Sequence, residues 1–162
     1  GPELLGSVGD SVRGALPGQS VNVPVSIRNV GTDDAANVTS ELYLSTDSSL
    51  DPATDTRIAV FVAPSVTAAG GTVDLTVPAT VPAGVAPGDY YLLLSVDAPN
   101  SIVEPSEQNN VAQAANLFAT AHQFTALTVD VPVGAAPGQS LQVDLTVANT
   151  GVPYVGNLAV GL

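Results

Sequence analysis

Three aspartates in one short segment are the residues of this chain that most resemble a metal-binding set. Asp47, Asp51 and Asp55 stand in YLSTDSSLDPATD, residues 43–55. Calcium takes about six to eight oxygen ligands, which these carboxylates, nearby hydroxyls and free carbonyls could supply, although the spacing is not that of an EF-hand. Alternatively, the Asp and Ser side chains accept hydrogen bonds from backbone amides and simply form turns. The sequence leaves both interpretations open.

A second polar segment, DAPNSIVEPSEQNN, occupies residues 97–110. Glu104 and Glu107 could bind a separate cation, because carboxylate oxygens are the ligands that calcium prefers. They could equally accept backbone hydrogen bonds that hold a long loop in place. The adjacent Asn109 and Asn110 are typical of positions where a chain turns through left-handed conformations.

Groups that could perform catalysis are scarce. His122 is the only histidine, and the chain has neither cysteine nor lysine. A Ser-His-Asp triad would have to recruit His122 from ATAHQ, a segment that we expect to join two domains. A cysteine nucleophile, a thiolate metal site and a P-loop lysine are excluded by composition. We therefore predict that the protein is not an enzyme.

The charge balance is strongly acidic, with 15 Asp and Glu residues against three arginines and a net charge of −12. Nucleic acids and anionic membrane surfaces both require clustered Lys and Arg, so neither is expected as a partner. No apolar run approaches the ~20 residues of a membrane-spanning helix, and we expect no direct membrane insertion. The same charge attracts divalent cations.

Alternating hydrophobicity predicts an all-β fold. In SVNVPVSIRN the residues expected to face a core are Val21, Val23, Val25 and Ile27. Pro24 points the other way and lacks an N–H, so we expect it at a sheet edge or a bulge. Seven such segments lie between Glu3 and Phe118: ELLGSV, SVNVPVSIRN, NVTSELYLS, IAVFV, GTVDLTVP, YYLLLSVD and VAQAANLF. Seven short strands separated by Gly/Pro turns indicate an immunoglobulin-like β-sandwich. Tyr90, which follows PGD, is expected to form a tyrosine corner.

This strand order places the two acidic segments apart. Loops between consecutive antiparallel strands alternate between the two ends of a sandwich. The loop of residues 46–57 follows the third strand and that of residues 98–110 follows the sixth, so they cannot share one metal ion. The seventh strand should end beside the three aspartates, where residues 149–156 of a following domain would arrive. A calcium ion there would stiffen a junction between domains.

The chain also repeats itself. Residues Gly14–Gly31 (GALPGQSVNVPVSIRNVG) align with Gly134–Gly151 (GAAPGQSLQVDLTVANTG) at a constant offset of 120. A fixed offset that preserves the inward positions indicates tandem domains. We therefore predict a first domain at residues 1–118, a linker at 119–123, and the truncated N-terminal part of a second repeat at 124–162. The partial repeat would leave an apolar face and a sheet edge uncovered, through which the chain could self-associate.

These motifs together resemble a known family. The PGQ turn, N-x-G after the second strand, YLSTD with spaced aspartates, PGDYYLL and VEP…E-x-N-N are similar to CARDB, the cell-adhesion-related domain found in bacteria. The similarity covers residues 3–118, and residues 124–162 look like the start of a second copy. The resemblance implies an immunoglobulin-like fold and a place in repeats of bacterial cell-surface or secreted proteins.

We therefore expect a non-catalytic tandem repeat module outside the cell, acting as a structural spacer or adhesion-related unit that calcium could stiffen. Its partners would be the neighbouring repeats of the same chain. One alternative is a carbohydrate- or protein-binding module, which the scarcity of aromatic residues disfavours. Another is an assembly subunit completed by strand exchange with a neighbouring chain.

Overall fold

A computed structural model describes residues 1–161, which form ten β-strands joined by turns and loops. The strands are β1 (Leu4–Val8), β2 (Ser20–Asn29), β3 (Ala35–Ser45), β4 (Thr56–Val66), β5 (Thr72–Thr80), β6 (Asp89–Ser95), β7 (Val111–Gln113), β8 (Phe118–Ala119), β9 (Phe124–Asp130) and β10 (Asp144–Asn149). Among the described residues, no helix is long and apolar enough to cross a membrane.

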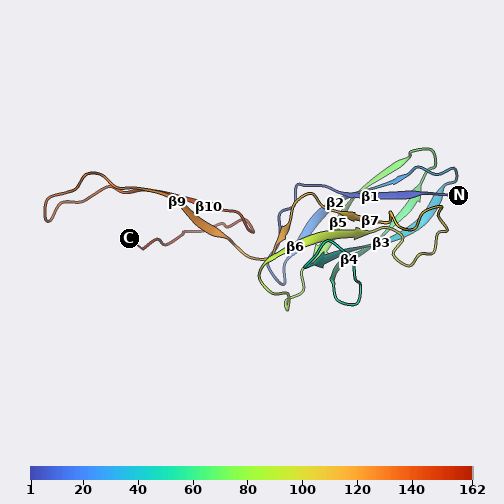
Figure 1. Cartoon of the computed structure of the whole chain (residues 1–162), viewed down its shortest axis with the longest axis horizontal. Helices are drawn as coiled ribbons and strands as arrows, with labels where there is room; N and C mark the ends of the chain where they lie inside the picture. Colours follow the sequence, from blue (N-terminus) through green and yellow to red (C-terminus); the bar gives the residue numbers. More distant parts are fainter. Residues whose placement is uncertain (162) are drawn as a thin grey trace.

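Strands β1 to β8 build two antiparallel sheets packed face to face (Figure 1). One sheet has the order β1-β2-β5. The other has the order β4-β3-β6-β7, and β8 pairs with the start of β6. Alternate residues of both sheets point into one core between them. The prediction of an immunoglobulin-like sandwich is therefore confirmed.

The alternation in β2 sets which residues enter this core. Val23, Val25 and Ile27 are all buried, and they meet Leu42 and Leu44 of β3 from the opposite sheet. Burying an aliphatic side chain of this size stabilises a fold by about 1.5–3 kcal/mol. The structure therefore confirms the predicted inward phase of this strand. This phase is strongly specified, because a one-residue slip would turn the whole set towards solvent.

The last predicted strand is divided. VAQAANLF forms β7 and β8, which pair with opposite ends of β6, and the chain bends between them at residues 115 and 116. The bend lets β8 reach the segment that follows β1. There Gly14 bridges Ala119, Ala15 N donates to Ala119 O at 3.1 Å, and Ala119 N donates to Arg13 O at 2.8 Å. A contact with a distant segment therefore interrupts a strand that looked continuous in sequence.

Pro24 does not lie on an edge strand, because β2 is the central strand of its sheet. It lies immediately beyond the last β1–β2 pair, Val8 with Val25, and its carbonyl accepts a hydrogen bond from Gly9 N at 2.8 Å. At this point β1 stops pairing with β2, so the missing N–H of proline interrupts no ladder hydrogen bond there. On the β1 side, β2 therefore has no strand partner at Pro24, and this is the local sheet edge that the sequence predicted for the proline.

Strands β9 and β10 form a separate hairpin that extends away from the sandwich at the end opposite the N-terminus (Figure 1). Asn149 pairs with Phe124 as Asn29 pairs with Leu4, 120 residues earlier. An irregularity between Thr146 and Val147 then shifts the register by one residue. Leu145, the equivalent of Val25, therefore pairs with Val129 and not with Thr128, which is the equivalent of Val8. The shift keeps an apolar pair at this position.

Candidate functional site: the two poles and the junction

The sandwich has two poles that carry different polar groups. We call the end where β3 finishes and β6 starts the C-terminal pole, and the end where β6 finishes and β1 starts the N-terminal pole. In the β3–β6 register Ser45 lies opposite Tyr91 and Glu41 opposite Ser95, so the two acidic loops lie at opposite ends, as predicted. They cannot contribute to one site.

The three aspartates of the C-terminal pole are held by backbone amides of their own loop. Ser49 N donates to Asp47 Oδ1 at 2.8 Å, and Ala53 N donates to Asp51 Oδ1 at 3.0 Å. Asp51 N donates to Asp55 Oδ2 at 2.7 Å. These are the contacts of side chains that form turns. The same aspartates also line one open hollow of about 330 Å³, so the fold does bring them together.

This hollow does not fit a preassembled metal centre. Among residues 1–161, no group of three or more His, Cys, Asp or Glu side chains has an arrangement that could hold a metal ion. In each aspartate, one carboxylate oxygen already accepts a hydrogen bond from a backbone amide of the loop. Calcium would require several more oxygens to converge from one side, which these contacts do not arrange.

At the N-terminal pole, Glu104 and Glu107 fasten a long loop to the first strand. Leu4 N donates to Glu104 Oε2 at 2.6 Å, across 100 residues of sequence. Asn110 Nδ2 donates to Glu104 Oε1 at 3.2 Å and to Glu107 Oε2 at 3.1 Å, and Glu104 N donates to Glu107 Oε1 at 2.9 Å. Asn109 Nδ2 donates to Glu3 Oε1 at 2.6 Å. The two predicted ligands therefore lie close together and serve as hydrogen-bond acceptors.

Glu104 is only 7% exposed. Burial raises the pKa of its carboxyl above the ordinary value, and Glu107 and Glu3 raise the pKa further. The hydrogen bonds from Leu4 and Asn110 act in the opposite direction, because they favour the charged form. The folded state therefore holds this proton more strongly than the unfolded state. This contribution to stability is present at low pH and is lost as the pH rises through the folded pKa.

We expect Glu104→Gln to be most favourable to stability at high pH, where the carboxyl that it replaces is ionised and buried, and less favourable as the pH falls. The glutamine Oε1 can still accept from Leu4 N, and Asn110 Nδ2 keeps its hydrogen bond to Glu107 Oε2, so the change loses one hydrogen bond, from Asn110 to Glu104 Oε1. Urea unfolding of both proteins between about pH 5 and pH 8 measures the difference, which should shrink as the pH falls. A difference that does not change with pH would contradict the argument.

Every residue that connects the sandwich to the hairpin takes part in a hydrogen bond. Thr120 is 1% exposed, and its N donates to Gly88 O at 2.8 Å. Its Oγ1 accepts from Gly88 N at 3.0 Å and donates to Ala86 O at 2.9 Å. Ala86 O also accepts from Tyr90 Oη at 2.8 Å, which is the predicted tyrosine-corner contact. In the next residue, Ala121 O already accepts from Val152 N of the second part at 2.8 Å.

Side chains continue these contacts across the junction. Gln123 Nε2 donates to Asp89 Oδ1 at 3.2 Å, and His122 Nδ1 lies 2.7 Å from Val152 O. The His122 ring also packs against Phe124 and Tyr154. A hollow of about 380 Å³ at this junction includes Gln123 and Asp89 in its lining, but none of the three aspartates. The second part therefore reaches Asp89 through Gln123, and Thr150 of the arriving loop lines the hollow with Asp89 and not with the predicted acidic cluster.

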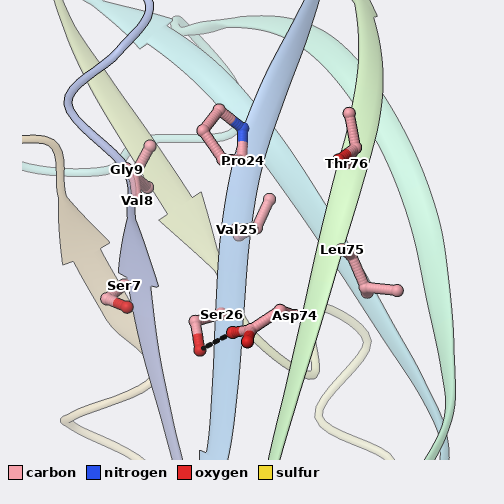
Figure 2. A pocket seen from close by; sticks show the side chains of 9 residues that line it. All are labelled: Ser7, Val8, Gly9, Pro24, Val25, Ser26, Asp74, Leu75 and Thr76. Carbon is pink, nitrogen blue, oxygen red and sulfur yellow. Dashed lines mark hydrogen bonds between the residues drawn. The ribbon is translucent and has the colours of Figure 1, made fainter.

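A further hollow of about 340 Å³ lies on the outer face of the β1-β2-β5 sheet (Figure 2). It forms beside Gly9 and Pro24, where β1 leaves β2. Ser26 Oγ donates to Asp74 Oδ1 at 2.7 Å on its floor, as the dashed line in Figure 2 marks. The nine lining residues include no aromatic side chain, and stacking platforms for a sugar ring are therefore missing from it.

The roles of Asp89, Thr120 and Gln123 at the junction were not predicted from the sequence, which placed only residues 149–156 there. One signal was present, because the N-x-G motif recurs at residues 29–31 and 149–151. In both places the asparagine Oδ1 accepts from the glycine N at 3.0 Å and from the N of residue 3 or 123 at 3.1 Å. The motif therefore marks where a chain enters a domain.

Comparison with known proteins supports the fold. A CARDB domain from Pyrococcus furiosus, described in complex with di-metal ions, is 20% identical with a TM-score of 0.51, over 69% of this chain and 88% of that chain. A domain described as part of a cell surface protein from Methanosarcina acetivorans is 19% identical with a TM-score of 0.53, over 74% of this chain and 92% of that chain. At such identities the likeness establishes the fold alone. A search of curated proteins found no match.

The family assignment has its own evidence in the sequence. The CARDB family model matches residues 2–114, which include every strand from β1 to β7 and both acidic loops. The match spans well over half of the chain. This protein belongs to the CARDB family.

Proposed function

We propose that the protein is a non-catalytic, extracellular repeat module that holds neighbouring domains of one chain in a fixed orientation, as a spacer or adhesion-related unit. Membership of CARDB, a cell-surface adhesion-related family, supports the broad role. The observation that carries the finer proposal is the junction, where each residue from Phe118 to Phe124 lies in a strand or takes part in a hydrogen bond. A free linker would let the domains tumble independently.

The recurrence of contacts at an offset of 120 supports a tandem arrangement. Thr150 N donates to Gln123 O at 2.9 Å as Val30 N donates to Glu3 O at 2.8 Å. In the PGQ turns, Gln19 N donates to Leu16 O at 2.9 Å and Gln139 N donates to Ala136 O at 3.0 Å. Because hydrogen bonds recur as well as sequence, we infer that β9, β10 and the turns beside them follow the arrangement of β1 and β2.

We further propose that hydrogen bonds, and not a cation, stiffen this junction. Thr120 anchors the chain to the sandwich, and Gln123 bonds to Asp89 on the same pole. The three aspartates hold their own turns and line a hollow separate from the junction. Calcium remains the competing explanation, because one relative is described with di-metal ions.

Distance measurements between two spin labels test both ideas. The chain contains no cysteine, so Thr76→Cys and Thr128→Cys give one label on an exposed position of each part. We expect a narrow distance distribution that is the same with excess Ca²⁺ and with EDTA. A distribution that narrows only with Ca²⁺, and no longer does so after Asp47, Asp51 and Asp55 are replaced by alanine, would favour calcium. A broad distribution under both conditions would exclude a fixed orientation.

Self-association is a second candidate function, favoured by the uncovered apolar face of the hairpin. Val129, Val131 and Val133 are exposed there, whereas their equivalents 120 residues earlier are Gly9, Ser11 and Arg13. Contiguous exposed apolar residues commonly mark an interaction surface. Light scattering on the labelled samples decides the matter, because a monodisperse monomer is incompatible with assembly through this face.

A further inference from the structure

The two domain entrances share one backbone frame but differ in the side chain that reaches the preceding domain. Residues 3 and 123 occupy the same place: the N of each donates to the following asparagine Oδ1 at 3.1 Å. The O of each accepts the amide of residue 30 or 150. In the first part this residue is Glu3, and in the second it is Gln123. The difference changes which groups the entrance can bind.

Glu3 offers only acceptors, and both of its oxygens are used within its own domain. Asn109 Nδ2 donates to Oε1 at 2.6 Å and Ser106 N donates to Oε2 at 3.1 Å. Gln123 keeps one acceptor, Oε1, which accepts from Thr150 Oγ1 at 3.2 Å. Its Nε2 supplies the donor that reaches Asp89 Oδ1 at 3.2 Å. Only the amide can bind its own domain and a carboxylate of the preceding one at once.

We propose that the residue at this entrance selects the neighbouring domain, which rests on the fixed orientation proposed above. A glutamine docks onto a C-terminal pole that carries a carboxylate, as Gln123 docks onto Asp89. A glutamate at the same place is repelled by that carboxylate. The N-terminal pole of the first part, with Glu3, Glu104 and Glu107, therefore fits a domain that presents an amide, hydroxyl or cationic side chain where this sandwich has Asp89. It does not fit a copy of its own C-terminal pole.

Two effects make this selection effective. Two carboxylates in this position repel each other even in water, and the hydrogen bond between residues 123 and 89 is lost as well. Together these effects correspond to about a tenfold change in the docked population. Asp89 takes part in neither of the ion pairs found among residues 1–161, but Arg13 lines the same hollow as Asp89 and Gln123. The expected change is therefore the repulsion that remains beside this arginine, and Arg13→Gln in the Gln123→Glu variant should broaden the distribution further.

The test places three variants in the doubly labelled chain: Gln123→Glu, Asp89→Asn, and both together. We expect Gln123→Glu to broaden the distance distribution and to lower the docked population by about tenfold. Asp89→Asn alone should leave it narrow, because the asparagine carbonyl still accepts from Gln123. The double variant should be narrow again, because the introduced asparagine side chain then donates to the new carboxylate.

Two controls make the result decisive. Hydrogen exchange at the amides of Thr150 and Val152 reports whether the hairpin still holds residues 121–123, and it should not change, because the matching position in the first part already carries glutamate. A narrow distribution in Gln123→Glu, or a double variant as broad as Gln123→Glu, would overturn the selection. A broad distribution in the parent protein would instead overturn the fixed orientation itself, and the selection with it.

Discussion

Gly14→Ala is expected to destabilise the sandwich by about 3 kcal/mol, because overpacking against a rigid backbone is costly. A Cβ at Gly14 would lie 2.0 Å from Ala119 O and 2.8 Å from Ala119 C. Neither atom can move without breaking the bridge between the segment after β1 and strand β8. Urea unfolding followed by circular dichroism measures the loss.

The second repeat provides a matched control for this change. Gly134 occupies the equivalent position and also has a positive φ, but a Cβ there would meet no heavy atom within 4 Å. Gly134→Ala adds backbone strain without the clash, so we expect a loss of about 1 kcal/mol or less. Equal losses in the two variants would show that the backbone conformation, and not the contact with Ala119, requires glycine at Gly14.

Asn29→Ala is expected to cost a similar amount, about 3 kcal/mol, because it leaves one buried and three partly buried backbone groups without partners. Asn29 is 0% exposed. Its Nδ2 donates to Asp33 O at 2.8 Å and to Val66 O at 3.0 Å, and its Oδ1 accepts from the amides of Glu3 and Gly31. The same unfolding measurement applies. A loss below about 1 kcal/mol would mean that water replaces these contacts.

Asn149→Ala is the control for the asparagine. Asn149 is exposed, although its side chain makes the corresponding bonds to Gln123 N, Gly151 N and Val152 O. These groups lie outside the sandwich, so we expect an effect below about 1 kcal/mol on the unfolding of the sandwich. Faster hydrogen exchange at the Val152 amide should be the main consequence. The contrast between the two asparagines therefore separates a contact that supports the sandwich from the matching contact in the hairpin.

Much of the first part could be predicted because its strands are half-buried. Val21, Val23, Val25 and Ile27 alternate with polar residues, and this local pattern survives folding because a slip would expose the whole set. The opposite placement of the two acidic loops followed from counting strands. The division of VAQAANLF into β7 and β8 could not be predicted, because it depends on contacts with residues 13–15, more than 90 residues away.

The candidate site was less predictable than the fold. The type of residue in YLSTDSSLDPATD was compatible with both a cation and a set of turns, since carboxylates accept from either. Similarly, Glu104 gave no sign that it would accept from the Leu4 amide across 100 residues. A carboxylate's role depends on which donors surround it, and those donors come from distant strands.

The sequence by itself determined the class of fold, the family resemblance, the offset of 120 and the absence of lysine and cysteine chemistry. Those properties depend on composition and local periodicity, which any conformation of the chain carries. Only the tertiary structure decided that the three aspartates hold turns, that Glu104 is buried, and that Gln123 reaches Asp89. The reason is physical: whether a polar side chain binds water, backbone or a partner depends on its neighbours in space and on its burial, and folding alone establishes both.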